Sequence, residues 1–125
     1  MDYSQVAIPD DPRELGLVYI AGPMTIVGPP TWNYPAFEEL AFDLRAEGRK
    51  VISPHELHKP SEDTAWDWYL RRDLSQLVKC SDIAMLPGWQ SSRGAKLEHY
   101  VAKALGLTVH HPTGYLPVVT EDSPR

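Results

Sequence analysis

Short apolar runs alternate along the chain with longer segments in which apolar residues recur every three or four positions. The short runs are bounded by Gly, Pro or polar residues, which is typical of buried strands. They predict four strands, at residues 15–21, 51–52, 82–86 and 107–111. The first run, LGLVYIA, ends at Gly22-Pro23, and the second is closed by Pro54.

Segments of helical periodicity lie between the predicted strands. They predict three helices, at residues 35–47, 65–79 and 94–105. Pro35 suits the first helical position, because the N–H that proline lacks would have no intrahelical partner there. Gly48 and Gly106 follow the first and last of these segments and are typical helix stops. Asp63 or Thr64 is expected to cap the middle helix.

Strands that alternate with helices indicate a parallel sheet with right-handed crossovers. We therefore expect an α/β fold, a single Rossmann-like (flavodoxin-like) domain whose parallel sheet of four to five strands is flanked by helices. The domain is expected over residues 15–116, between polar tails at 1–14 and 117–125. Such sheets bind ligands at the carboxyl ends of their strands. The candidate segments are those that follow the strands, at 22–33, 55–64, 87–94 and from His111 onward.

Charge and cysteine content exclude several classes of function. The formal net charge is −5, whereas binding of nucleic acid polymers needs a basic surface. Cys80 is the single cysteine, so no intramolecular disulfide forms, and we expect it in the core. His55 and His58 are spaced HxxH without further ligands, so no metal is expected. No apolar run is long enough for a membrane span and no signal-peptide pattern opens the sequence, which favours a cytoplasmic protein.

The most informative polar pattern runs from Ser91 to Glu98, after a predicted strand and into a predicted helix. Ser91, Ser92 and the backbone N–H groups near Gly94 would face an anion at the helix N-terminus, and Arg93 would add positive charge. Glu98 lies about one turn into the helix, from where its carboxylate would reach back toward the strand ends. The alternative is a Ser-capped helix whose glutamate faces solvent.

Other candidates border the first strand, the middle helix and the loops. Asp73 lies at the edge of the apolar stripe of the middle helix, so it is either functional or paired with a neighbouring arginine. Tyr19 lies near the end of the first strand, where the pattern alone favours a core position. Trp32 and Trp89 lie in candidate site loops, where each either stacks on a base or covers the core. Trp66 is expected in the core.

Four motifs together resemble the nucleoside 2-deoxyribosyltransferase-like superfamily. They are V-Y-I-A-G-P-M-T near the start, R-D-L before the third strand, L-P-G-W after it and S-x-G-A-x-x-E on the last helix. The resemblance covers about Leu17–Val109 and is greatest to a compact branch of small proteins, often described only as a domain of unknown function and frequent in phages. The characterised relatives are nucleoside deoxyribosyltransferases and nucleoside 5′-monophosphate N-glycosidases.

The resemblance implies roles for individual residues. Glu98 matches the glutamate that attacks C1′ of the sugar, Asp73 the aspartate that assists at the base or the incoming water, and Tyr19 the tyrosine that orients the glutamate. His55 falls where the monophosphate hydrolases carry a histidine near the base. Ser92 lies six residues before Glu98, where the hydrolases have a phosphate-binding serine and the transferases an aspartate against the sugar 5′-hydroxyl. The remaining substrate-binding candidates are Gly22, Met24, Trp89, Ser91, Arg93 and Gly94.

The serine at position 92 favours a (deoxy)nucleoside 5′-monophosphate as the substrate, because an aspartate there would repel the phosphate. The expected reaction is hydrolysis of the N-glycosidic bond through a covalent glutamyl-ribosyl intermediate, without metal or organic cofactor. Two alternatives are a deoxyribosyltransferase that exchanges bases on free deoxynucleosides, and a non-catalytic nucleotide-binding or sensing module. The resemblance also implies a homodimer or higher homo-oligomer, to whose sites Tyr115 and residues 112–117 would contribute, and no membrane partner.

Overall fold

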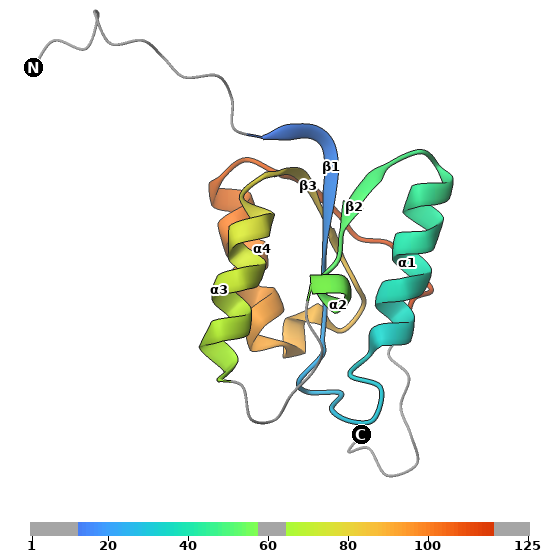
Figure 1. Cartoon of the computed structure of the whole chain (residues 1–125), viewed down its shortest axis with the longest axis vertical. Helices are drawn as coiled ribbons and strands as arrows, with labels where there is room; N and C mark the ends of the chain where they lie inside the picture. Colours follow the sequence, from blue (N-terminus) through green and yellow to red (C-terminus); the bar gives the residue numbers. More distant parts are fainter. Residues whose placement is uncertain (1–12, 58–64, 117–125) are drawn as a thin grey trace, which may run out of the picture.

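A four-stranded parallel sheet forms the middle layer of the fold. The computed structural model describes residues 13–57 and 65–116. In chain order the elements are β1 (Glu14–Ala21), α1 (Tyr34–Ala46), β2 (Lys50–Ile52), α2 (Pro54–Leu57), α3 (Trp66–Leu77), β3 (Cys80–Met85), η1 (Trp89–Ser91), α4 (Arg93–Ala104) and β4 (Thr108–His110). Figure 1 shows α1 on one face of the sheet and α3 and α4 on the other. The predicted α/β, Rossmann-like fold is confirmed.

The observed elements differ from the predicted ones mainly at their ends. Strand β1 begins inside the predicted tail, because the backbone N–H of Glu14 donates to the carbonyl oxygen of Lys79 at 2.9 Å. Residues 54–57, at the start of the candidate segment 55–64, form the short helix α2, for which no helix was predicted, and Pro54 is compatible with a helix start. Residues 58–64 lie outside the described part of the chain, as do most of the two predicted tails.

Two further local predictions concern the starts of helices. Within the candidate segment 87–94, residues 89–91 form the 3₁₀ turn η1 after Gly88, whose φ of 87° suits glycine. Helix α3 begins after Ala65, which provides no side-chain cap. The expected capping residues Asp63 and Thr64 lie outside the described residues.

The two faces of the sheet pack against different helices. On the α1 face, Val18 and Ile20 of β1 pack with Phe37 and Leu40 of α1. On the opposite face, which α3 and α4 cover, the alternate residues of β1 and β3 join a cluster with apolar residues of these helices: Leu17, Tyr19, Ala21, Ile83, Met85, Leu77, Ala95 and Ala102. This alternation directs Tyr19 toward α3 and α4.

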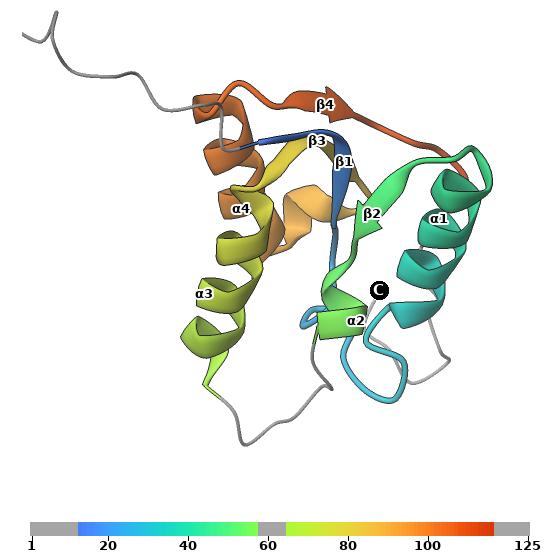
Figure 2. The same cartoon turned by 45° about the horizontal axis from the view of Figure 1, so that its top comes forward.

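The strand order is β2-β1-β3-β4. The first crossover thus leads from β1 to β2 on one side, and the second leads from β2 past β1 to β3 on its other side. Figure 2 shows β4 at the edge of the sheet remote from β2. The carboxyl ends of β1 and β3 therefore lie at the topological switch point, where open α/β sheets bind ligands. A Cβ on Gly22 would lie 2.7 Å from Cβ of Leu86, so only glycine permits this close approach of the two strand ends.

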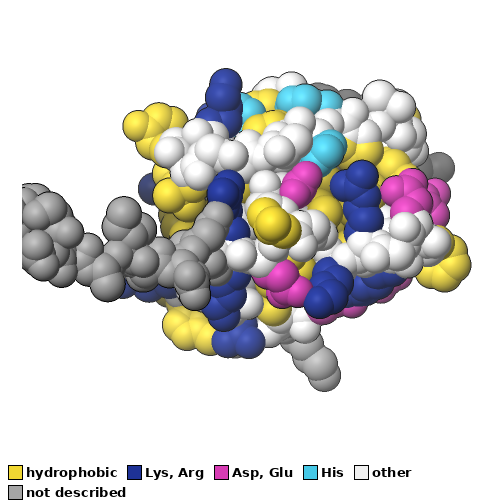
Figure 3. Space-filling view, turned by 90° about the horizontal axis from the view of Figure 1, so that it is seen from above, with side chains coloured by type: hydrophobic (Ala, Val, Ile, Leu, Met, Phe, Trp, Pro, Cys, Tyr) yellow, Lys and Arg dark blue, Asp and Glu magenta, His cyan; other side chains and the backbone are white. Residues whose placement is uncertain are grey.

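The amino ends of the strands, viewed in Figure 3, carry interspersed basic, acidic and histidine side chains. Two of these pairs are in direct contact: Lys50 Nζ lies 2.6 Å from Glu14 Oε1, and His110 Nε2 lies 2.7 Å from Asp82 Oδ2. Cys80 is fully buried nearby, which confirms its expected core position, and burial raises the pKa of its thiol to about 12. Among the described residues, every helix is too short or too polar to traverse a lipid bilayer.

Candidate active site

A cavity of about 520 Å³ opens at the carboxyl ends of the strands, within the size range of small-molecule pockets. The loop after β1, the start of α1, one face of α3 and the first turns of α4 surround it. Its lining residues are Gly22, Met24, Thr25, Ile26, Trp32, Tyr34, Phe37, Pro54, Trp66, Tyr69, Leu70, Asp73, Ser91, Ser92, Arg93, Gly94, Ala95 and Glu98. The cavity thus lies at the switch point that the strand order creates.

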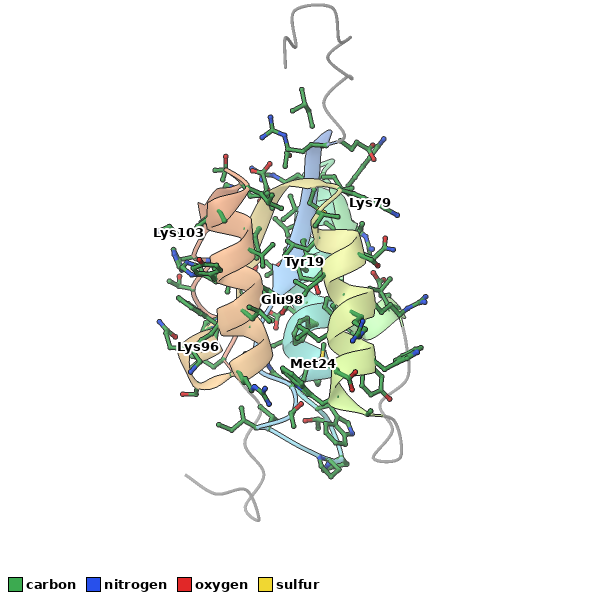
Figure 4. All side chains as sticks on the ribbon, turned by 90° about the vertical axis from the view of Figure 1, so that its left-hand side faces the viewer. Tyr19, Met24, Lys79, Lys96, Glu98 and Lys103 are labelled. Carbon is green, nitrogen blue, oxygen red and sulfur yellow. The ribbon has the colours of Figure 1, made fainter. Side chains whose placement is uncertain are left out.

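Glu98 lies in the wall of this cavity and is only 5% exposed. It follows Ala95 on the buried side of α4, so the helix directs its carboxylate toward the sheet. The hydroxyl of Tyr19, itself fully buried at the end of β1, donates a hydrogen bond to Oε2 of Glu98. Figure 4 shows the two side chains together between α3 and α4, with Met24 nearer the open end. The alternative of a solvent-facing Glu98 is therefore wrong.

Burial changes the protonation of this pair. Removal of the Glu98 carboxyl from water raises its pKa to about 8, and the negative charge of Asp73 adds to the rise, whereas the hydrogen bond from Tyr19 opposes it. Burial and the same two acids raise the pKa of the Tyr19 hydroxyl well above its ordinary value. At neutral pH Tyr19 is therefore a hydrogen-bond donor, and Glu98 is mostly protonated in the empty cavity.

Asp73 of α3 lines the same cavity from the opposite helix. It lies three residues after Leu70, which also lines the cavity, and this spacing puts both on one side of α3. Two carboxyl groups that interact across a partly apolar cavity disfavour the doubly charged state, so they tend to retain one proton between them. Such a pair can supply a nucleophilic carboxylate and a proton donor at once.

The N-terminus of α4 forms the end of the cavity that carries Ser91 to Gly94. Ser92 is the N-cap, and its hydroxyl oxygen accepts a hydrogen bond from the backbone N–H of Ala95 at 3.2 Å. The Ser cap of the alternative interpretation is thus observed, although its solvent-facing Glu98 is not. The hydroxyl proton of Ser92 and the N–H groups of Arg93 and Gly94 lie where a helix offers donors to an anion.

Trp66 belongs to the cavity wall, which corrects the prediction that it lies in the core. It is the first residue of α3 and is half-buried. The guanidinium carbon of Arg93 lies 4.2 Å from the centroid of its ring. The helical pattern places Trp66 on the apolar side of α3 but does not show that the first turn of this helix lies at the cavity mouth.

Trp89 and His55 are two predicted site residues that do not line the cavity. The Trp89 ring packs beside the core cluster and stacks on His99, with 4.3 Å between ring centroids. His55 contacts the rings of Tyr34 and Phe37, which separate it from the cavity, and its Nδ1 pairs with the hydroxyl of Ser53. Burial lowers the pKa of His55, so its ring is mainly neutral at neutral pH. The remaining candidates, including Gly22, Met24 and Ser91, lie in the lining.

Several lining residues had no signal in the sequence analysis, notably Tyr34, Phe37 and Tyr69. Trp32, by contrast, was a candidate, and it reaches the cavity through an uncommon backbone conformation. Trp32 and Asn33 both have positive φ, of 52° and 63°. Asparagine tolerates this left-handed region, but for tryptophan it stores strain of about 1–2 kcal/mol. The loop before α1 therefore holds Trp32 in a strained position at the cavity.

Tyr115 was expected to contribute to the site of a neighbouring subunit. In the structure it contacts its own chain, since its hydroxyl donates to Oδ2 of Asp43 at 2.5 Å and its ring packs beside the α1 core. Among the described residues, no group of three or more His, Cys, Asp or Glu side chains is arranged to hold a metal ion.

Comparison with protein families gives a match over residues 17–111 to the family described as "Domain of unknown function (DUF4406)". The chain belongs to this family. The matched region runs from β1 to the end of β4 and includes all the acids and the α4 N-terminus of the cavity. A comparison with curated proteins found no match. The family description assigns no activity.

Proposed function

We propose that this protein hydrolyses the N-glycosidic bond of a (deoxy)nucleoside 5′-monophosphate. The observation that carries the proposal is the buried Glu98 carboxyl, hydrogen-bonded to Tyr19 and electrostatically coupled to Asp73 in one cavity. A buried acid with a raised pKa beside a second acid is a feature of catalytic sites rather than of stable cores. The resemblance of the motifs to deoxyribosyltransferase-like enzymes supports the same assignment.

In the first step a carboxylate oxygen of Glu98 forms a bond to C1′ while the bond between C1′ and the base nitrogen breaks. The electron pair of the broken bond goes to the base, and Asp73 delivers a proton to it, directly or through water. The reactive form of the pair therefore has Glu98 ionised and Asp73 protonated. This form has the same number of protons as the neutral-Glu98 form favoured in the empty cavity, so only a shift of one proton separates them.

In the second step Asp73, now a carboxylate, removes a proton from water as the water oxygen attacks C1′. The ester bond to Glu98 breaks and restores its carboxylate, while Asp73 is protonated again. The products are free base and (deoxy)ribose 5-phosphate. Tyr19 holds Oε2 of Glu98 through its hydroxyl throughout, so it is a positioning residue in this scheme. The reaction requires no cofactor.

A phosphate fits the end of the cavity where α4 begins. The backbone N–H groups of Arg93 and Gly94, the Ser92 hydroxyl and the Arg93 guanidinium are all donors, and the described lining residues at this end, Ser91 to Gly94, include no acid. An aspartate at position 92 would instead suit a free 5′-hydroxyl. The serine therefore favours a monophosphate hydrolase over a nucleoside transferase.

The experiment is incubation of the protein with a panel of ribo- and deoxynucleosides and their 5′-monophosphates, followed by chromatography of the free base. We expect base release from one or more monophosphates and little from the matching nucleosides. Base exchange between a free nucleoside and an added base would favour the transferase instead. Stable binding of a nucleotide with no base release over hours would favour a sensing module.

A matched pair of variants tests the phosphate end. Asp and Asn both cap helices as well as Ser does, so S92D and S92N should fold alike. S92D adds a negative charge against the phosphate and should reduce kcat/KM for monophosphates at least tenfold more than S92N does. Equal effects of the two substitutions on monophosphate turnover would contradict a phosphate at this position.

A further inference from the structure

The mouth of the cavity holds an arginine, Arg93, that forms no ion pair with any carboxylate in the described part of the chain. Arg93 is exposed at the start of α4 and lines the cavity. Within residues 13–57 and 65–116 it forms no ion pair, although the whole chain carries 17 acidic residues. Its guanidinium carbon lies 4.2 Å from the centroid of the Trp66 ring. Within the described ranges, an aromatic surface rather than a counter-ion therefore holds this cation in place.

Contact with the ring leaves the hydrogen-bonding capacity of the arginine intact. The guanidinium N–H groups point outward in the plane of the group, whereas a ring holds it through its face. A carboxylate partner would occupy those donors, but the indole does not. Arg93 thus keeps a planar fork of donors that matches the oxygens of a phosphate.

Trp66 is itself held against the first turn of α4. A Cβ on Gly94 would lie 3.8 Å from Cζ2 of Trp66, so the indole runs beside the backbone whose N–H groups face the anion end. Trp66 starts α3, and Arg93 starts α4, so their contact joins the two helices that carry Asp73 and Glu98. The Trp66–Arg93 contact is therefore built from the same two helices as the acid pair.

We propose that Trp66 is a specificity-determining residue that holds Arg93 as a phosphate clamp at the cavity mouth. The inference rests on the proposed function for the position of the 5′-phosphate and goes beyond it in the role of Trp66. Trp66 acts on the phosphate through Arg93, not by contact with the base. Loss of the indole then weakens phosphorylated ligands even when they carry no base.

Ribose 5-phosphate is the probe that separates these roles, because it has the sugar and the phosphate but nothing for an indole to stack on. Its dissociation constant is measured by calorimetry or competition at millimolar concentration. We expect W66L to weaken binding about fivefold, the loss that corresponds to one cation–π contact, and W66F to weaken it less, since a ring face remains. R93M should weaken it at least as much as W66L.

A double-mutant cycle decides whether the two residues act together. If Trp66 works through Arg93, W66L has no further effect on ribose 5-phosphate binding in the R93M background. Additive losses would overturn the inference. So would unchanged ribose 5-phosphate binding in W66L combined with weaker binding of nucleosides, because that pattern describes a base-stacking platform.

Separate controls distinguish a folding defect from loss of binding, and the clamp from the glycosidase. Circular dichroism and thermal unfolding confirm the fold of each variant, and W66F with R93M completes the cycle if W66L does not fold. Coupled binding of ribose 5-phosphate without base release from any nucleotide would leave the clamp standing and reject the glycosidase. Failure of wild-type protein to bind ribose 5-phosphate at millimolar concentration would reject the clamp, even if base release is observed.

Discussion

Two carboxyl groups at opposite ends of the sheet have opposite protonation behaviour. For Asp82, near the amino ends of the strands, burial raises the pKa, but hydrogen bonds from His110 and Ser81 outweigh it and the pKa is lowered. For Glu98, at the carboxyl ends, burial and a second acid outweigh the hydrogen bond from Tyr19, and the pKa rises to about 8. A cationic or multiple-donor environment keeps a carboxylate ionised, whereas burial in a cavity wall beside another acid raises its pKa, as the proposed reaction requires.

The largest expected difference between the two ends is in catalysis. E98Q removes the nucleophile but keeps a hydrogen-bond acceptor for Tyr19, so base release should fall on the order of 10³-fold or more. D82N is the matched control at the other end of the sheet and should keep activity within about twofold of wild type. Chromatographic assay of free base measures both. Normal turnover by E98Q would remove Glu98 from the mechanism.

The next effect concerns the pH dependence of kcat/KM. The reactive pair carries one proton, and the pKa of Glu98 near 8 marks the loss of that proton, so activity should decline above about pH 8. D73N removes the proton donor and should slow base release roughly 10²-fold. Burial still raises the Glu98 pKa in this variant, but the acid pair that must keep one proton is gone, so the alkaline decline should disappear. A wild-type rate that instead increases through pH 8 would show that Asp73 donates no proton.

The pH dependence of the free energy of unfolding should report the burial of the Glu98 carboxyl without any substrate. Because the pKa of Glu98 is raised on folding, the folded state binds its proton more tightly, and this group lowers the free energy of unfolding as pH rises from about 4.5 to 8. E98Q should match wild type near pH 4 and exceed it on the order of 4–5 kcal/mol near pH 9. Urea unfolding at the two pH values measures the gap. A gap that is constant with pH would mean that Glu98 is not buried as an acid.

The smallest effect is expected at the structural end. The lowered pKa of Asp82 contributes stability above its unfolded value, near pH 4, and this contribution disappears as pH falls through the lowered pKa. D82N should therefore lose up to about 1 kcal/mol at pH 7 and match wild type in acid. The sign of its pH dependence is opposite to that of E98Q. The same sign for both variants would contradict the comparison.

The order of strands and helices was predictable because each element has its own periodicity and stop signals. Strand β3 alternates between the two sheet faces, and Gly48 and Gly106 follow the helices that they end. Asp73 and Glu98 were identifiable as candidates from their positions and from the motif resemblance, and the structure brings both to one cavity.

What the sequence could not supply is the direction of side chains in loops and at helix starts. Trp66 and Trp89 are both tryptophans beside a helix, yet one lines the cavity and the other packs beside the core. Their difference depends on the angle at which the chain enters α3 and α4, which no local pattern encodes. His55 lies one side chain away from the cavity because Tyr34 and Phe37, more than fifteen residues earlier, occupy the space between.

The most direct test of the account is capture of the covalent intermediate. Wild-type protein is mixed with the monophosphate that releases base fastest, quenched in acid and analysed by intact and peptide mass spectrometry. The proposed mechanism predicts a mass increase equal to one (deoxy)ribose 5-phosphate minus water, located on Glu98 and absent from E98Q. The same adduct on another residue, or an equal adduct on the E98Q protein, would contradict it.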